Sequence, residues 1–521
     1  MARILVTEEI AESGLARLRA AGHDVDVRLA PTPEELAELI VGANALIIRS
    51  ATQVDAALLE RADQLVVVGR AGIGLDNVQV DAATARGVMV VNAPESNILS
   101  AAEHTMALLL AQARNVPAAH AALVAGRWER SKWEGVELAD KTLGVIGLGR
   151  IGRLVAHRAA AFGMRVVAHD PYVSADRARQ LSIELLDLDE LLAQSDFVTL
   201  HVARTPETIG LLNADRLARA KAGVRIINVA RGGLIDEAAL ADAIRSGHVA
   251  GAAIDVFATE PTTESPLFGL EQVVVTPHLG ASTREAQDKA GETIAEMVAL
   301  ALDNEFVPYA VNVSAGEVSE TTKPFLALAE RLGALFVALN DGVPPVLEVS
   351  FQGQIAAGDT RILTVAVLKG MFARGSDAPV SFVNAPLMAA DRGVEVREQR
   401  STTAVDFVNL LTVRGGHHSL AATTVGLRGE QRLARIDDNI VDIPPSPHML
   451  YVRNEDRPGM IGKVGTILGE SGVNIDDMDV GRDPNGEPST MLVATNRPIP
   501  AEVIERLRRT EGIVSVHVMS A

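Results

Sequence analysis

The sequence predicts an α/β protein of several domains, and three observations support this class. The chain has 521 residues, and at ~150 residues per domain this length suggests three or four domains. Hydrophobic residues make up 48% of the chain and aromatic residues 3%, which favours helices packed on parallel sheets over an all-β protein. Short apolar runs alternate with helix-like segments over the first three hundred residues, as in repeated βα units.

Composition excludes several classes of function. The formal net charge of −19 leaves no surplus of basic residues to neutralise phosphates, which argues against a nucleic-acid partner. The absence of cysteine removes disulfides, thiolate catalysis and Cys-ligated metals, and we expect no metal site. No segment reaches ~18 apolar residues without a charge, so we expect no membrane span. The N-terminal "MARILVTEEI" is typical of a strand rather than of a signal peptide, and the expected location is cytoplasmic.

The first hundred residues predict a parallel sheet with a binding edge. Predicted strands are "ARILVTE", "ALIIRSAT", "LVVVGRAG" and "GVMVVNAPE", with helices between them. One of these helices, "TPEELAELIVGA", begins at Thr32 with Glu35 at the spacing of a capping box. Two strands end in arginine, at Arg49 and Arg70. Because ligands bind beyond the carboxyl ends of strands in such sheets, both arginines are expected near a ligand.

A glycine motif follows a predicted helix at Ser100 to Asn115. In "GVIGLGRIG", Gly147, Gly149 and Gly152 lie between a strand and a helix in the G-x-G-x-x-G pattern. The pattern permits a tight turn, a close approach of a pyrophosphate to the helix N-terminus, and close helix–strand packing. Alone the motif is weak, since glycine-rich turns share it. The next strand ends at Asp170, which can bind ribose hydroxyls and would repel a 2′-phosphate, so NAD is favoured over NADP.

Three ionisable residues follow later strands: Arg231 after "IINVA", Glu260 after "AAIDVFAT" and His278 after "VVVTP". Taken singly they have ordinary alternatives, namely a surface charge, a turn residue and a structural hydrogen bonder. Together they match hydride transfer, in which a histidine takes the hydroxyl proton and a carboxylate orients that histidine. An arginine binds a substrate carboxylate and polarises the adjacent carbonyl. Asp255 is expected beside the nicotinamide.

Four motifs in order, "GLGRIG", "NVARGGLIDE", "DVFATEP" and "TPHLGAST", resemble the D-isomer-specific 2-hydroxyacid dehydrogenases. The resemblance covers about residues 1–316 and implies NAD as cofactor, with Arg231, Glu260 and His278 as the catalytic residues. Besides the three glycines, it implies dinucleotide contacts at Arg150, Ile151, Asp170, Val202, Val229 and Asp255.

The family resemblance also implies the domain order. A Rossmann NAD domain, residues 99–288, is inserted into a flavodoxin-like substrate-binding domain formed by residues 1–98 and 289–316. Two helices, Ser100–Asn115 and the one after Ala281, are expected to cross between these domains, and closure over the cleft is expected.

The loops "IIRSAT" and "GRAGIGLDNV" resemble those of family members that act on a phosphorylated hydroxy acid. The resemblance implies that Arg49 and Arg70 face a phosphate and a carboxylate, and that Ser50, Gly72 and Asn97 add hydrogen bonds. The alternative is that Arg70 only supports the fold. In "GRWERSKWEG", Arg130 and Lys132 either reach an active site, even that of a neighbouring subunit, or belong to a solvated basic loop.

Two further segments complete the chain. Residues 319–445, with "FVNAPLMAADRGVEVRE", resemble an α/β intervening (allosteric substrate-binding) domain. Residues 449–521 follow a β-α-β-β-α-β pattern, and "RNEDRPGMIGKVGTILGESGVNI" resembles a ferredoxin-like ACT domain, which binds amino acids at a paired interface. The resemblance places the effector at Asn454, Asp456 and Asn474. A pure dimerisation module is the alternative.

Both extensions together imply an enzyme that oxidises 3-phospho-D-glycerate to 3-phosphooxypyruvate with NAD⁺, the first committed step towards L-serine. They also imply inhibition by L-serine and a homotetramer. Two alternatives stay open: reduction of another 2-oxo acid such as 2-oxoglutarate, including as a side activity, and a non-catalytic NAD-sensing regulator.

Overall fold

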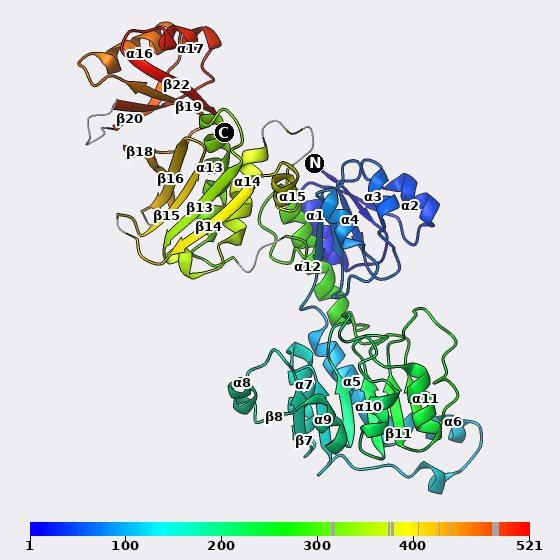
Figure 1. The fold of residues 1–521 in the computed structure, drawn as a ribbon. Helices are drawn as coiled ribbons and strands as arrows, with labels where there is room; N and C mark the ends of the chain where they lie inside the picture. Colours follow the sequence, from blue (N-terminus) through cyan, green and yellow to red (C-terminus); the bar gives the residue numbers. More distant parts are fainter. Residues whose placement is uncertain are drawn as a thin grey trace.

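The structure is a computed structural model that describes residues 1–313, 318–373, 376, 380–404, 406–426, 428–437, 439–481 and 489–520. Within these ranges the chain forms four α/β units, each built around one sheet (Figure 1). The predicted boundary near residue 316 falls at residues 314–317, which lie outside the described residues.

The first unit has a five-stranded parallel sheet in the order β2-β1-β3-β4-β5. This is the flavodoxin-like order that the sequence predicts. The predicted capping box is confirmed, because Thr32 accepts the N–H of Glu35 and Glu35 accepts that of Thr32. The elements are β1 (Arg3–Val6), α1 (Glu12–Ala20), β2 (Asp24–Val27), α2 (Pro33–Leu39), β3 (Ala45–Ile48), α3 (Ala56–Arg61), β4 (Val67–Arg70), α4 (Val80–Ala85) and β5 (Met89–Asn92).

The second unit has a seven-stranded parallel sheet in the order β12-β11-β10-β9-β6-β7-β8. The order reverses between β6 and β9, which makes the predicted Rossmann arrangement with its ligand crevice at that point. The elements are α6 (Val116–Val124), η1 (Arg130–Trp133), β6 (Thr142–Ile146), α7 (Arg150–Ala161), β7 (Arg165–His169), α8 (Ala175–Gln180), β8 (Glu184–Leu185), α9 (Leu188–Gln194), β9 (Phe197–Leu200), α10 (Ala214–Arg219), β10 (Val224–Asn228), α11 (Glu237–Arg245), β11 (Val249–Ile254) and β12 (Val273–Val275).

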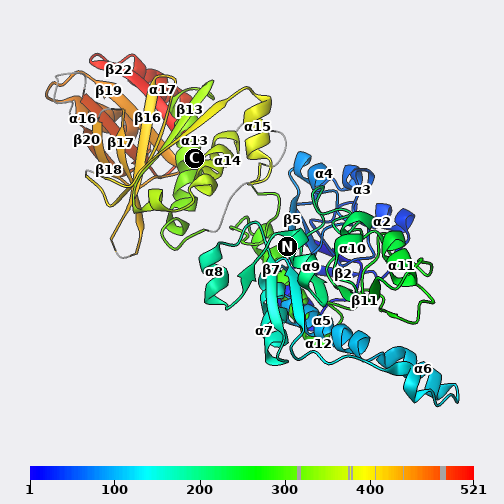
Figure 2. The ribbon, with the colours of Figure 1, turned by 60° about the horizontal axis from the view of Figure 1, so that its bottom comes forward.

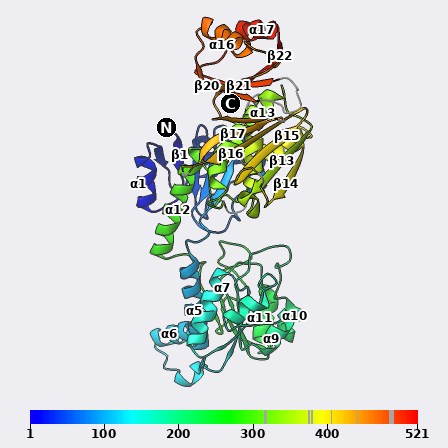
Figure 3. The ribbon, with the colours of Figure 1, turned by 90° about the vertical axis from the view of Figure 1, so that its left-hand side faces the viewer.

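Two long helices connect these units. Helix α5 (Ile98–Ala113) packs on α7 of the second unit, and α12 (Arg284–Leu302) packs on α1 of the first (Figure 3). At their N-terminal ends the Oγ of Ser100 lies 2.7 Å from the Oγ1 of Thr283. The two chain crossings therefore meet at this contact.

The third unit is a six-stranded mixed sheet in the order β14-β13-β15-β16-β17-β18. Among its described residues, only β13 and β14 pair in parallel. Its core joins apolar faces of α13 and α14 to the sheet. The elements are η2 (Lys323–Phe325), α13 (Leu326–Leu339), β13 (Val346–Gly353), η3 (Gln354–Ala357), α14 (Arg361–Ala373), α15 (Ala385–Asp391), β14 (Glu395–Ser401), β15 (Asn409–Gly415), β16 (His418–Val425), β17 (Glu430–Ile436) and β18 (Asn439–Ile443).

The fourth unit follows the predicted β-α-β-β-α-β order and forms an antiparallel sheet, β20-β21-β19-β22. The elements are β19 (His448–Asn454), α16 (Met460–Glu470), β20 (Ile475–Gly481), β21 (Ser489–Thr495), α17 (Ala501–Arg508) and β22 (Ile513–Ser520). Across the described residues no helix has the length and apolar character needed to cross a bilayer. The same residues contain no group of three or more His, Cys, Asp or Glu side chains placed to hold a metal ion.

Candidate active site

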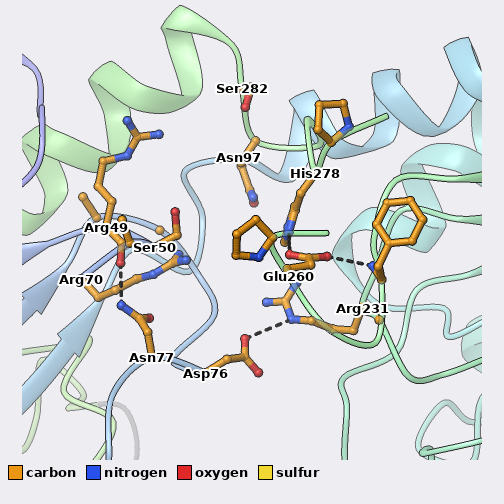
Figure 4. A pocket seen from close by; sticks show the side chains of 18 of the residues that line it. Arg49, Ser50, Arg70, Asp76, Asn77, Asn97, Arg231, Glu260, His278 and Ser282 are labelled. Carbon is orange, nitrogen blue, oxygen red and sulfur yellow. Dashed lines mark hydrogen bonds and ion pairs between the residues drawn. The ribbon is translucent and has the colours of Figure 1, made fainter. Parts of the chain in front are cut away.

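A cleft of about 900 Å³ lies between the first and second units (Figure 4). The first unit contributes the loops after β3 and β4, and the second contributes the loops after β10, β11 and β12. Both sets are carboxyl ends of parallel strands, where backbone groups and side chains converge on a ligand.

One end of the cleft is cationic. Arg49 and Arg70 lie here with Ser50 (Figure 4). Burial, and then the charge of Arg231, lower the pKa of Arg70 to about 10, which leaves its guanidinium charged at neutral pH. Gly72 has φ +159°, and a Cβ there would clash with the Nη1 of Arg70, so a larger residue would displace this arginine.

Two buried polar atoms in this region lack protein partners. They are the Nε of Arg70 and the Oδ1 of Asn97, and neither has a hydrogen-bond partner among the described residues. Both residues line the cleft. Since buried polar groups are normally paired, these atoms mark a place where a polar ligand fits.

His278 and Glu260 face each other at the other end of the cleft. The Nδ1 of His278 lies 2.6 Å from one Glu260 oxygen, and the N–H of Phe257 donates to the other at 2.8 Å. Burial alone would raise the pKa of Glu260, but the hydrogen bonds from His278 and Phe257 hold it below its ordinary value. The pair therefore consists of a carboxylate anchored at both oxygens and a histidine whose Nε2 is left for substrate.

Asp255 fixes the loop that carries His278. The N–H of His278, which has φ +53°, donates to the Asp255 carbonyl at 2.8 Å. The Asp255 carboxylate accepts hydrogen bonds from the N–H groups of Leu279 and Gly280. It also accepts the Thr276 hydroxyl at 2.6 Å, and it lies 3.2 Å from the Nε2 of His104. Asp255 is fully buried and both oxygens are in use. Its carboxylate thus holds the backbone of the His278 loop, and its predicted position beside the nicotinamide stays a prediction.

Arg231 follows β10 and lies on the Glu260 side of the cleft (Figure 4). Its Nε lies 3.7 Å from the Oδ2 of Asp76, which belongs to the first unit. The adjacent glycine brings it close to the loop of Glu260, because a Cβ at Gly232 would clash with the Phe257 carbonyl oxygen. Gly233 adopts φ +78°. The two glycines thus allow Arg231 to lie close to the loop that carries Glu260.

The dinucleotide motif has the geometry that a pyrophosphate requires. Helix α7 starts after Gly149 without a side-chain cap, so its first N–H groups are available to an anion. A Cβ at Gly149 would meet open space, whereas one at Gly152 would clash with the Gly147 carbonyl oxygen. Asp170 accepts the N–H of Leu148 at 2.8 Å, which ties its carboxylate to the glycine loop. These residues fit NAD.

The other predicted dinucleotide residues surround this loop. Arg150 pairs with Glu95 of the first unit, Nη1 to Oε1, at 2.9 Å. A Cβ at Gly147 would lie 2.8 Å from the Val202 Cγ1, and Val229 packs near Gly280. Ile151 contacts the core beneath the helix.

Lys132 lies outside this cleft within one chain. Its Nζ pairs with Glu271 at 2.7 Å and lies 4.7 Å from the centre of the Trp133 ring. Neither Lys132 nor Arg130 is among the residues that line the cleft.

The predicted effector residues do not all come together in one chain. Asn454 ends β19 opposite Ser489, and its buried Oδ1 has no partner among the described residues. Asp456 follows two residues later. Asn474 precedes β20, whose start pairs with Thr495 at the other end of the sheet. A site that uses all three residues therefore needs two copies of the unit.

Sequence reasoning missed three residues that shape the cleft. Asp76 pairs with Arg231, and Asn77 donates to the carbonyls of Arg49 and Thr52 at 2.9 and 2.6 Å. His104 contacts Asp255 from α5. The motif "GRAGIGLDNV" contains Asp76 and Asn77, but no spacing rule connects them to Arg231 or to the loop after β3.

Three family models match successive parts of the chain. Residues 106–280 match the D-isomer specific 2-hydroxyacid dehydrogenase NAD binding domain. Residues 321–437 match the D-3-phosphoglycerate dehydrogenase intervening domain, and residues 448–512 match the ACT domain.

Two relatives that match over nearly their whole length are both named D-3-phosphoglycerate dehydrogenase. The chain is 49% identical to a D-3-phosphoglycerate dehydrogenase of Mycobacterium tuberculosis over 96% of both chains, and 42% identical to one of Archaeoglobus fulgidus over 98% of both. The solved structure of the TT0316 protein from Thermus thermophilus is 38% identical, with a TM-score of 0.56 over 59% of this chain and 99% of that one. The chain therefore belongs to the D-3-phosphoglycerate dehydrogenases, which are NAD-dependent oxidoreductases of the D-isomer specific 2-hydroxyacid dehydrogenase family.

Proposed function

We propose that this cleft oxidises the C2 hydroxyl of 3-phospho-D-glycerate, giving 3-phosphooxypyruvate. The observation that carries the proposal is the polarity of the cleft. Arg49 and Arg70 lie at one end, and the His278–Glu260 pair lies at the other end with Arg231 on the same side (Figure 4). The substrate has the same order of groups, with a dianionic phosphate at one end and a hydroxyl beside a carboxylate at the other.

Side chains of this protein accept the substrate's hydroxyl proton and stabilise the charges of the reaction. His278 takes the hydroxyl proton at Nε2 while its Nδ1–H donates to Glu260, whose carboxylate stabilises the resulting imidazolium. Arg231 holds the substrate carboxylate and polarises the C2 oxygen as it becomes a carbonyl. NAD⁺, when bound at the glycine loop, supplies the acceptor for the hydride that leaves C2.

The phosphate is assigned to the cationic end. Arg49 and Arg70 supply the charge, and Ser50 and Asn97 supply hydrogen bonds, with the unpaired Asn97 oxygen available to a protonated phosphate or to water. Rotation of the units about the Ser100–Thr283 contact would bring this end towards His278 and exclude water from the reacting atoms.

The test is NADH production from 3-phospho-D-glycerate by the purified full-length chain. We expect turnover, and we expect the His278→Gln variant to lose at least ~10²-fold in kcat. Turnover of D-glycerate or D-lactate but not of phosphoglycerate would reject the substrate. NAD binding without turnover of any hydroxy acid would indicate a regulator.

Reduction of 2-oxoglutarate is a second candidate activity. Arg49 and Arg70 are two cations that suit a second carboxylate as well as a phosphate. The ratio of kcat/KM values for the two substrates decides which one the cleft selects.

Regulation by an amino acid and assembly of the chain are proposed together. We propose L-serine as the effector, bound by Asn454 and Asp456 of one copy and Asn474 of another, within a homotetramer. The placement of these residues at opposite ends of the ACT sheet supports a paired site.

Helix α6 and the segment after it extend away from the second unit and expose Leu123, Val124 and Trp128, an apolar surface suited to a second copy (Figure 2). Light scattering and serine titration test both points.

The domain limits and the location belong to the same proposal. The four sheets support domains at 1–98 with 289–316, 99–288, 319–445 and 449–521, which limited proteolysis tests.

We also propose a cytoplasmic location, because a phosphorylated substrate and NAD do not cross membranes freely, and cell fractionation tests this.

A further inference from the structure

We infer that Glu8, which follows the first strand, is a positioning residue that organises the phosphate end of the cleft. The inference rests on the proposed function, because it assumes that this end receives the phosphate of a hydroxy acid. Glu8 is not one of the residues that line the cleft, whereas Arg49 and Ser50 are. Its effect on substrate would therefore pass through the loop that carries those two residues.

The Glu8 carboxylate holds the backbone of the loop at residues 49–52. One oxygen accepts the N–H of Arg49 at 2.8 Å and that of Thr52 at 3.0 Å. The other accepts the N–H of Ala51 at 3.1 Å. Three of the four N–H groups in the loop thus converge on one carboxylate, and the loop curls around it.

The opposite side of the same loop is also fixed. The Asn77 amide donates to the Arg49 carbonyl at 2.9 Å (Figure 4). It also donates to the Thr52 carbonyl at 2.6 Å. The hydroxyls of Thr7 and Thr52 lie 2.8 Å apart. With both faces of the backbone held, the groups left to a ligand are the side chains of Arg49 and Ser50 and the Ser50 N–H, which has no partner among the described residues.

A carboxylate beside an anion site has two opposing effects. Its charge repels a phosphate, and its hydrogen bonds order the loop that binds the phosphate. Although burial raises the pKa of Glu8, the N–H donors of Thr52, Arg49 and Ala51 lower it below the ordinary value, so the group is ionised at neutral pH. Because both oxygens face loop N–H groups, we expect the ordering effect to exceed the repulsion.

The sign of the effect can be measured with Glu8→Gln, which keeps the shape but removes the charge and one acceptor oxygen. In the full-length enzyme we expect the Kd of 3-phospho-D-glycerate, measured by calorimetry, to rise about tenfold, the size expected from one charge-assisted hydrogen bond. The KM of NAD⁺ should stay within about twofold, because the glycine loop is in the other unit. The kcat/KM ratio of 3-phospho-D-glycerate to D-glycerate, which lacks the phosphate, should fall by a similar factor.

Glu12→Gln is the matched control, since it removes a carboxylate from the exposed start of α1 in the same unit. Glu8→Asp should recover part of the lost affinity. Tighter binding by Glu8→Gln, unchanged binding, or an equal loss for D-glycerate would overturn the inference. If Glu8→Gln does not fold, Asn77→Ala replaces it, and the same selective loss for the phosphorylated substrate is required.

The binding measurement separates this inference from the proposed function. Wild-type enzyme that binds 3-phospho-D-glycerate without turnover refutes the proposed reaction and still reports on Glu8. If the wild-type enzyme turns over 3-phospho-D-glycerate and Glu8→Gln loses equally for this substrate and for D-glycerate, only the role of Glu8 is refuted. Wild-type enzyme that does not bind it refutes both.

Discussion

The Nδ1 of His278 lies 2.6 Å from the Oε2 of Glu260, and the Oε1 of the same carboxylate is held by the Phe257 N–H. The carboxylate therefore cannot rotate away from the imidazole without losing a backbone hydrogen bond. This arrangement selects the histidine tautomer that presents Nε2 to the cleft, and it compensates the positive charge that the ring gains when it takes a proton.

Glu260→Gln tests this relationship. Glutamine keeps the size of the side chain and an acceptor for Phe257, but it removes the charge that faces His278. We expect kcat to fall by about 10²–10⁴-fold, in the range of general-base contributions, while the Kd of NADH changes little. The measurement is steady-state kinetics with NADH fluorescence titration. A kcat within about threefold of wild type would show that the carboxylate only supports the loop.

Arg231→Ala should separate substrate binding from cofactor binding. Arg231 lines the cleft on the side of the His278–Glu260 pair (Figure 4), so its loss is expected to remove both a carboxylate ligand and the polarising charge. We expect a higher KM for 3-phospho-D-glycerate and a kcat lower by about 10²-fold or more, with NAD binding preserved. Arg231→Lys should rescue only part of this, because an ammonium group cannot bind bidentately. Arg245→Ala, at an exposed position in α11, is the control. Loss of NADH binding in Arg231→Ala would contradict the assignment.

Asp170 is expected to serve both specificity and loop order. Its two oxygens accept the N–H groups of Leu148 and Tyr172, at 2.8 and 2.9 Å. Asp170→Asn keeps an acceptor but removes the charge, so the kcat/KM ratio of NADP to NAD should rise about tenfold, while Asp170→Ala should also weaken NAD. Kinetics with both cofactors measures this. An unchanged ratio in Asp170→Asn would mean that the charge does not face the ribose.

Much of the fold follows from sequence because its signals are local. The strands of the first two units are short apolar runs separated by helices, and right-handed βα connections leave few possible strand orders. The third sheet was predicted only as α/β. Its antiparallel pairs, such as β13 with β15, join segments separated by two helices and another strand, and no local pattern encodes that register.

The sequence predicts site residues that directly follow a strand. It does not predict contacts between side chains that are far apart in the sequence. Arg231, Glu260 and His278 converge because their strands are neighbours in one parallel sheet. The motif around Asp255 gave no sign that its carboxylate holds the His278 loop, since His104 reaches it from a helix 151 residues away in sequence. Glu8 acts on a loop 41–44 residues further on, again beyond local patterns.

Asp255→Asn tests the network behind His278 through its pH dependence. Burial raises the pKa of Asp255, but hydrogen bonds from His104, Thr276 and Leu279 bring it below its ordinary value. Its unfolded pKa is ~3.9, so the stability that the ionised form contributes is fully present above that pH and is lost only as the pH falls through the lower folded value. Asparagine cannot accept all the donors, and we expect a loss of about 1–3 kcal/mol in the free energy of unfolding. Urea unfolding of wild type and variant measures this loss in the free energy of unfolding, which should be at least as large at about pH 5.5 as at about pH 7. A smaller loss at about pH 5.5 would show that Asp255 is not held in its ionised form.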